Sequence, residues 1–214
     1  MVQFLQEHLS DDEIARLRGV FEPLAVAVRD LVDATIRTTV DEETVRTVQS
    51  QIEQATAQLR AQQIDGSYGV RITPSGLSMP WGNAVVGVRN ALAPPLKIHH
   101  DREGEAWSEF HLGAAYEGPP GMVHGGVCAM VLDHILGETS SHGKRTKFTG
   151  TIEVKYLRAT PLGPVRADAW IDRIEGIKTY VVGTLSDQDG VTAEARGCSS
   201  SRSGLASPVS RHIE

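Results

Sequence analysis

The sequence predicts an α+β domain, in which several antiparallel strands surround one long helix, preceded by a separate pair of helices. Helical spacing of apolar residues dominates residues 1–64, whereas alternating apolar and polar residues dominate residues 96–200. A nearly all-apolar helical stretch over residues 123–139 interrupts the alternating region. One long helix among several strands is typical of an α+β plan, so we expect the sheet to wrap around that helix.

Composition excludes several classes of protein. The 214 residues carry a net charge of −6 and are 40% hydrophobic, which gives enough apolar side chains for a core and argues against a general polyanion binder. The two cysteines, Cys128 and Cys198, imply no disulfide framework. No apolar run reaches a membrane span of about 20 residues, and the first residues lack the features of a signal peptide. We therefore expect a cytoplasmic protein that binds neither membrane nor nucleic acid.

Residues 1–64 are predicted to form an N-terminal helical extension of two antiparallel helices. Ser10 to Glu13 forms a capping-box pattern that opens the first helix, and Pro23 should kink this helix or mark its restart. Asp41 opens the second helix. Its apolar stripe consists of Val45, Val48, Ile52, Ala55 and Leu59. Acidic residues outnumber basic ones here, which argues against DNA reading, so we expect the pair to pack on the main domain or on a second subunit.

The rest of the chain divides into a connecting segment, a strand-rich domain and a tail. Residues 65–95 are rich in Gly, Pro and Ser, and a short strand is expected around Val85 to Val88. Residues 96–200 form the main domain, and residues 201–214 read as a flexible polar tail. The expected strands, besides the central helix, are Leu96–His100, Ala106–Tyr116, Lys147–Leu157, Val165–Ile174, Thr179–Gln188 and Val191–Ser199.

The most informative stretch runs from Glu117 to Gly137. A Pro/Gly turn leads into the apolar helix, with His124-Gly125-Gly126 at the helix start and Asp133 in its middle. A carboxylate inside a buried helix is costly unless it is paired or takes part in chemistry. The free backbone N–H groups at the helix start form a ready oxyanion site, which a substrate carbonyl can reach closely at glycine. In the alternative interpretation, the glycines only allow tight packing and Asp133 bonds to a neighbouring strand.

This pattern resembles the hotdog-fold acyl-CoA thioesterases of the phenylacetate-pathway and THEM type (PaaI-like). The resemblance covers about residues 83–200 and rests on Gly121-Met-Val-His-Gly-Gly126 with an Asp nine residues after the His, together with Thr149, Tyr156–Pro161 and Gly176–Lys178. It implies a sheet wrapped around the central helix and hydrolysis of a thioester to a carboxylic acid and free CoA. The N-terminal helices are not part of the shared core.

The resemblance also implies roles for individual residues. Gly125 N–H would be the oxyanion donor, Asp133 the general base or nucleophile, and Thr149 would position the attacking water. Val123 and Gly126 would contact substrate. His124 either holds the turn or bonds near the substrate carbonyl.

Geometry adds a constraint on this site. Gly125 and Asp133 are eight residues apart on one helix, about 12 Å along its axis, so one thioester group cannot contact both. The working pair should come from two chains, which implies a homodimer or a dimer of dimers.

Other residues bear on the substrate and on departures from the family pattern. Lys144, Arg145, Lys155, Arg158 and Lys178 are candidates to bind CoA phosphates, and the resemblance favours Arg158 and Lys178. Many relatives carry Asn or Gln six residues before the His, where this chain has Gly118; the adjacent Glu117 is a possible substitute. His99-His100-Asp101 is a poor metal site, because neighbouring strand residues point to opposite faces. We expect no metal and no cofactor other than the CoA of the substrate.

Three functions are compatible with these features. The first is an acyl-CoA thioesterase with sites shared between two chains. The second is a non-catalytic acyl-CoA-binding or sensing module that docks a protein through its helical hairpin. The third, an enoyl-CoA hydratase on the same fold, ranks last, because neither His124 nor His134 is placed to act with Asp133 on one carbon atom.

Overall fold

The computed structural model describes residues 4–94, 96–141 and 147–200, so the predictions for Lys144, Arg145 and the 201–214 tail lie outside the described residues. The main elements, in chain order, are β1 (Phe4–Gln6), α1 (Asp11–Arg37), α2 (Glu42–Arg60), β2 (Val70–Ile72), β3 (Ser78–Met79), β4 (Glu105–Leu112), the short 3-10 helix η1 (Ala114–Tyr116), α3 (Gly125–Ser141), β5 (Phe148–Tyr156), β6 (Gly163–Glu175), β7 (Lys178–Asp187) and β8 (Gly190–Ser200).

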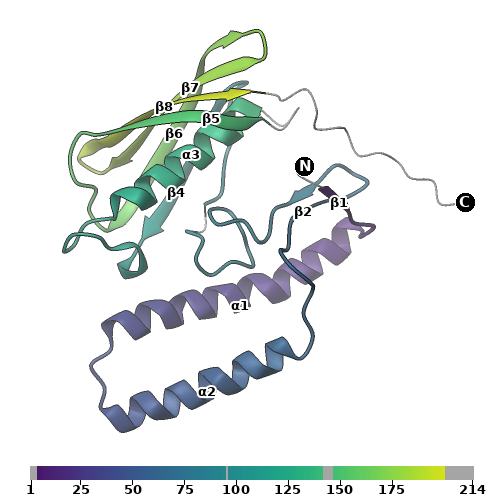
Figure 1. The fold of residues 1–214 in the computed structure, drawn as a ribbon, viewed down its shortest axis with the longest axis vertical. Coiled ribbons are helices and arrows are strands. Elements are labelled where there is room, and N and C mark those ends of the chain that lie inside the picture. Colours follow the sequence, from purple (N-terminus) through teal and green to yellow (C-terminus); the bar gives the residue numbers. More distant parts are fainter. Residues whose placement is uncertain (1–3, 95, 142–146, 201–214) are drawn as a thin grey trace, which may run out of the picture.

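The main domain is a five-stranded antiparallel sheet that curves around α3 (Figure 1). The strand order is β4-β6-β7-β8-β5, so β4 and β5, which flank α3 in sequence, lie at opposite edges. Strands β6, β7 and β8 follow one another through short turns, whereas β5 pairs with β8 across a long separation in sequence. The predicted α+β arrangement and the hotdog plan of a sheet wrapped around a long helix are therefore confirmed.

The core lies between α3 and the concave face of the sheet. Val131, Leu132, Ile135 and Leu136 of α3 are at most 1% exposed. They pack against alternate residues of the strands, which are Val165, Ala167, Val181, Leu185, Ala193 and Ala195. Small residues on the strands let the helix approach closely, because a Cβ at Gly183 or Gly197 would lie 3.1 or 3.3 Å from Leu136. This packing fixes the position of α3 on the sheet.

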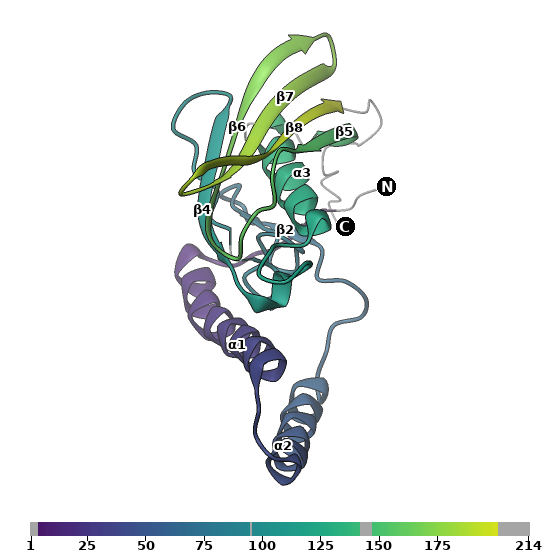
Figure 2. The same cartoon turned by 90° about the vertical axis from the view of Figure 1, so that its left-hand side faces the viewer.

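The N-terminal helices form the predicted hairpin. Ser10 and Glu13 complete the expected capping box at the start of α1, and the Asp41 side chain caps α2. The helix α1 continues through Pro23, so the predicted restart does not occur. One face of α1 packs on Met79 and Trp81 through Ile14. Figures 1 and 2 show α1 between the sheet domain and α2, which is the element farthest from the sheet.

Several local predictions are wrong. The expected strand Leu96–His100 is reduced to a single bridge between His99 and Trp107, and the strand predicted to reach Tyr116 ends at Leu112 and gives way to η1. No strand forms around Val85 to Val88, because the Asn83 side chain accepts the N–H groups of Val85 and Val86 and holds a turn.

A small three-stranded sheet, β1-β2-β3, was not predicted. In it, β1 from the N-terminal segment pairs in parallel with β2 from the connecting segment.

Candidate active site

The turn before α3 is fixed by its own hydrogen bonds. The Glu117 carboxylate accepts the N–H of Gly121 at 2.7 Å, and Gly118 N–H donates to the carbonyl of Met122 at 2.9 Å. Gly121 has φ of 74°, a conformation that favours glycine. Val123 is anchored to the main domain, since its N–H donates to the carbonyl of Thr160 at 2.8 Å. The turn therefore delivers His124 and the helix start to a defined place.

Gly118 leaves no room for a side chain. A Cβ at this position would lie 2.7 Å from the Cα of His124 and 3.1 Å from its Cβ. The Asn or Gln that relatives carry six residues before the His therefore has no counterpart at this position unless His124 moves. Glu117 does not substitute for it in this arrangement, because its carboxylate closes the turn on Gly121.

The start of α3 presents two donors. Gly126 N–H donates to Nδ1 of His124 at 3.0 Å, so a neutral His124 must carry its proton on Nε2. The His124 side chain is exposed. Gly125 N–H lies in the first turn of α3, and within the described ranges no acceptor bonds to it. The Gly125 amide and the His124 Nε2–H are thus left to meet a ligand at the positive end of the helix dipole.

Tyr156 belongs to this group, although the sequence reasoning did not assign it a role. It is the last residue of β5, and its hydroxyl donates to the carbonyl of Gly125 at 2.7 Å. A Cβ at Gly125 would lie 3.4 Å from the Tyr156 ring and hydroxyl. The contact ties the edge strand to the helix start. An aromatic residue at a strand end is usually explained by packing, so the sequence gave no reason to single it out.

Asp133 lies two turns farther along α3, and its side chain is only partly buried. Its Oδ1 atom is buried, and in the part of the chain that the structure describes it has no hydrogen-bond partner. The alternative interpretation, in which Asp133 bonds to a neighbouring strand, therefore does not account for Oδ1. The adjacent His134 is partly buried, and desolvation lowers the pKa of its imidazole below the ordinary value.

Thr149 and Lys178 lie at the far end of the sheet from His124. A Cβ at Gly137 would lie 3.9 Å from the Thr149 hydroxyl, which places Thr149 one turn beyond Asp133. Lys178 pairs with Ser200, which also pairs with Phe148 at the start of β5. Most of the predicted site residues therefore separate into two groups. The helix-start group contains Val123, His124, Gly125 and Gly126, to which the structure adds Tyr156, and the mid-helix group contains Asp133 and Thr149.

Arg158 is bound within the chain. Its guanidinium forms an ion pair with Asp187 and donates to the carbonyl of Gly190 at 2.8 Å. The hydrogen bond from Arg158 lowers the pKa of the Asp187 carboxyl to about 2. Arg158 thus closes the turn between β7 and β8, and a phosphate would have to compete with Asp187 for it.

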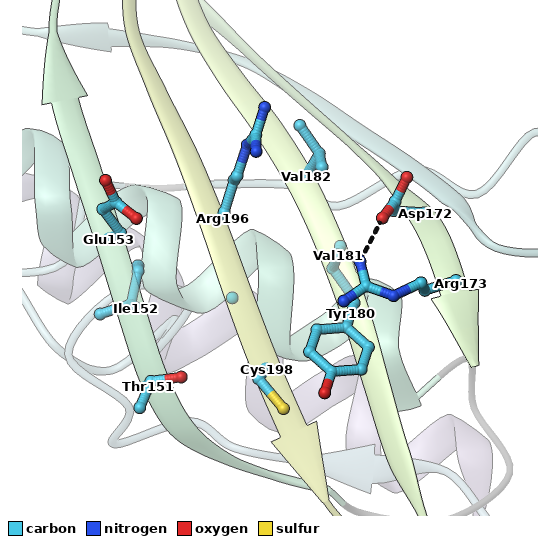
Figure 3. Close-up of a pocket in the computed structure, with 11 residues that line it drawn as sticks. Thr151, Ile152, Glu153, Asp172, Arg173, Tyr180, Val181, Val182, Arg196 and Cys198 are labelled. Carbon is cyan, nitrogen blue, oxygen red and sulfur yellow. Dashed lines mark hydrogen bonds and ion pairs between the residues drawn. The ribbon is translucent and has the colours of Figure 1, made fainter. Parts of the chain in front are cut away.

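Two other features lie away from both groups. His99 stacks on Trp107 with ring centroids 4.3 Å apart, the Asp101 carboxylate accepts the Trp107 indole N–H at 2.7 Å, and His100 Nε2 lies 3.8 Å from a carboxylate oxygen of Glu138. All three residues considered for a metal therefore have other contacts. A hollow of about 400 Å³, lined by residues of β5, β6, β7 and β8, lies on the sheet face opposite α3. Figure 3 shows the side chains that line it. Its lining mixes charged, polar and apolar side chains, and it contains none of the predicted site residues.

No described helix of this chain combines the length and the apolar character needed to span a bilayer.

Comparisons with known proteins match this architecture. Residues 120–194 match the family model described as the Thioesterase superfamily. A crystal structure of a thioesterase superfamily protein superposes with a TM-score of 0.74 at 27% identity and covers 91% of this chain and 97% of that chain. The match extends beyond the main domain into the N-terminal helical segment.

Curated relatives match only in part. The human protein named acyl-coenzyme A thioesterase THEM5 is 31% identical over 91 residues, which is 41% of this chain and 37% of that protein. The Xenopus laevis protein named acyl-coenzyme A thioesterase THEM4 is 32% identical over 81 residues, 37% of this chain and 36% of that protein. The chain thus spans little more than a third of the length of these relatives. The resemblance to hotdog-fold thioesterases predicted from the sequence is confirmed.

Proposed function

We propose that the protein is an acyl-CoA thioesterase whose active sites are shared between two copies of the chain. The family match over residues 120–194 and the acyl-coenzyme A thioesterase names of the partial relatives support the reaction class. The observation that carries the proposal is the separation of the two groups on α3. Within the described residues, the Gly125 N–H at the helix start has no hydrogen-bond acceptor, and Oδ1 of Asp133 in the middle of the helix has no hydrogen-bond donor.

The edge strand β5 supports a way to bring these groups together. Its Tyr156 end contacts Gly125, and its Thr149 end lies beside Gly137, one turn from Asp133. In the five-stranded sheet β5 pairs with β8, and no strand of the described residues pairs with its other edge. If two β5 strands pair in an antiparallel manner, the Tyr156 end of one strand lies beside the Thr149 end of its mate. Each Gly125 then approaches the Asp133 of the second copy, and a two-fold dimer holds two composite sites.

Such a site can hydrolyse a thioester. The substrate carbonyl oxygen accepts Gly125 N–H, with His124 Nε2–H as a second donor, so that negative charge developing on this oxygen is stabilised. The Asp133 carboxylate of the second copy takes a proton from water as the water oxygen attacks the carbonyl carbon, and Thr149 orients this water. The tetrahedral intermediate then collapses to the carboxylic acid as the C–S bond breaks. The departing CoA thiolate takes the proton that Asp133 had accepted, which returns Asp133 to a carboxylate. In the alternative mechanism, the Asp133 carboxylate itself attacks the carbonyl carbon and displaces the CoA thiolate, and water then hydrolyses the resulting anhydride.

CoA phosphates are assigned to basic residues outside this centre. Lys178 lies exposed at the β6–β7 turn, whereas Arg158 would first have to leave Asp187. We therefore place Lys178 ahead of Arg158 as the phosphate contact.

The first experiment measures thiol release from a series of acyl-CoAs of graded chain length. Asp133→Asn should keep the fold and lower kcat about 10²- to 10⁴-fold, the usual contribution of a general base. Glu138→Gln is the matched control, since Glu138 is an exposed carboxylate on the same helix. Saturable acyl-CoA binding without thiol release by the wild-type chain would instead establish a non-catalytic binding module.

A mixing experiment tests whether the site is shared. Gly125→Pro removes the proposed N–H donor at the first position of α3, where proline is tolerated. Each single variant alone should be inactive. Random dimers of the Asp133→Asn and Gly125→Pro chains should regain about a quarter of the wild-type activity, because half of the dimers are mixed and each mixed dimer has one intact site. Mixtures that stay inactive, although mixed dimers form, would place both residues in a site within one chain.

A further inference from the structure

Helix α2 has no packing partner in the described chain. None of its 19 residues is buried. Its apolar stripe stays in contact with water, with Val45 at 46%, Val48 and Ile52 at 37%, and Leu59 at 55% exposure. A hydrophobic face of this length is typical of a helix that packs on something else.

The apolar residues of both N-terminal helices follow the spacing of a helical bundle. On α2, the stripe Val45, Val48, Ile52, Ala55 and Leu59 advances by three and four residues in turn. On α1, Leu17, Phe21, Leu24 and Val28 do the same. Alternating steps of three and four keep one seam facing a neighbouring helix. Two antiparallel helices that each carry such a seam make half of a four-helix bundle.

A groove of about 920 Å³ lies between α1, the C-terminal end of α2 and the connecting segment. Its α1 wall includes Leu17, Phe21, Leu24 and Val28, and Leu59 and Ile64 contribute from the end of α2 and beyond. Trp81 of the connecting segment also lines it. The groove is mostly apolar, although Glu7, Arg71 and Arg89 also line it, and α2 leaves it open because it reaches the groove only through Leu59.

The composition of α2 also indicates that this helix needs contacts with another element to be stable. Thr44, Val45, Thr47, Val48 and Ile52 are β-branched, and such residues lower the stability of an isolated helix. Even alanine-rich helices shorter than about 15 residues are marginal in water, and most helices in proteins depend on tertiary packing. An α2 that buried nothing would therefore be a poor helix.

We propose that the groove is filled by α2 of a second copy of this chain, so that two hairpins exchange their α2 helices into one four-helix bundle. The residues that flank the stripe are uncharged: Gln49, Gln51, Thr56 and Gln58. Two identical helices can thus lie side by side along most of the seam without repulsion between like charges, and their amides can bond across it. The mutual docking of identical surfaces closes on itself as a two-fold pair.

A membrane surface fits this helix less well. Helices that lie in a lipid interface are rich in Lys and Arg on their polar face. The polar face of α2 carries Glu42, Glu43 and Glu53 against Arg46 and Arg60, and it has no Lys.

Sedimentation velocity of the full chain measures the association. Ile52→Asp places a charge in the seam and should weaken self-association about 100-fold or more, because the carboxylate would be buried without a partner. Ser50→Asp is the matched control. It adds the same charge two residues away, about 200° around the helix, and should leave association unchanged.

A crosslinking experiment decides where the second copy docks. The full chain, with a photoreactive benzoylphenylalanine in place of Ile52, is mixed as isotopically light and heavy copies and irradiated. Crosslinks between light and heavy chains that map to α1 and α2 support the exchanged bundle, whether or not a β5 interface also holds the copies together. Crosslinks confined to single chains, or reaching another protein, would overturn it, as would equal association constants for Ile52→Asp and Ser50→Asp. Neither readout depends on acyl-CoA turnover.

Discussion

Gly118→Ala tests how tightly the turn before α3 is built. Its Cβ would lie 2.7 Å from the Cα of His124, which is backbone and cannot rotate away. Two carbon atoms pack at about 3.5–4.0 Å, so the turn and His124 must separate by about 1 Å. Overpacking of this kind costs about 1–3 kcal/mol, partly offset by the lower entropy of alanine in the unfolded chain. A shift of about 1 Å in a catalytic group can cost about 100-fold in rate.

Two measurements check this reasoning. Thermal unfolding should show a Tm lower by several degrees, at about 2–4 °C per kcal/mol for a chain of this size. Thiol release should show kcat/KM reduced by about 100-fold. Gly113→Ala serves as the control, because its φ is −89° and no atom comes closer than 4.0 Å to its added Cβ. If Gly118→Ala matched Gly113→Ala in both assays, the turn would yield without displacing His124, and the steric account of Gly118 would be refuted.

Three further predictions concern single side chains. Tyr156→Phe removes the 2.7 Å hydrogen bond to the Gly125 carbonyl and should lower kcat by up to about tenfold with a small change in Tm, whereas a purely structural Tyr156 would change Tm and leave kcat alone. Burial lowers the pKa of His134 below its ordinary 6.5, so as the pH falls the unfolded chain binds this proton before the folded chain does, and wild-type stability should fall below about pH 6.5. In denaturant unfolding, the free energy of unfolding of His134→Gln should therefore depend less on pH than that of the wild type between about pH 7 and 5. An equal pH dependence in both proteins would contradict this assignment. The pKa of Asp187 is about 2 in the folded chain and 3.8 ordinarily, so its ion pair with Arg158 stabilises the fold fully above about pH 4 and less as the pH falls toward 2. The difference in Tm between Asp187→Asn and the wild type should therefore shrink between about pH 4 and pH 2. A constant difference would argue against the ion pair as its cause.

The elements with strong local signals were predictable. The apolar run around His124 predicted a helix over residues 123–139, and both ends of α3 lie within two residues of that range. A helix that is buried on most sides is apolar around its whole circumference, which makes it easy to identify in the sequence. The capping box at Ser10 likewise marked the start of α1. The strands β1, β2 and β3 were missed, since each has two or three residues and depends on a partner that lies elsewhere in the chain. Periodicity cannot be read from so short a run.

The candidate site shows the same division. His124, Gly125 and Asp133 could be selected as candidates from their spacing, and the helix rise predicts that Asp133 acts in a different pocket from His124 and Gly125. The partners of Arg158 could not be found in this way. Asp187 and Gly190 reach it only after β7 and β8 have formed their turn. The missing side chain at Gly118 was visible in the sequence, but its cause, a close approach of two backbone segments, was not.

The position of β8 has a consequence for the order of folding. Although β8 is the last described strand, it lies between β7 and β5, and Phe148 pairs with Ser200. The β6-β7-β8 meander closes only short loops and can form early, whereas β5 must wait for a partner some 40–50 residues later in the chain. Because β5 carries both Thr149 and Tyr156, both groups of candidate site residues are completed in one late step. We expect intermediates that retain a native-like meander while the contact between Tyr156 and the start of α3 is still absent.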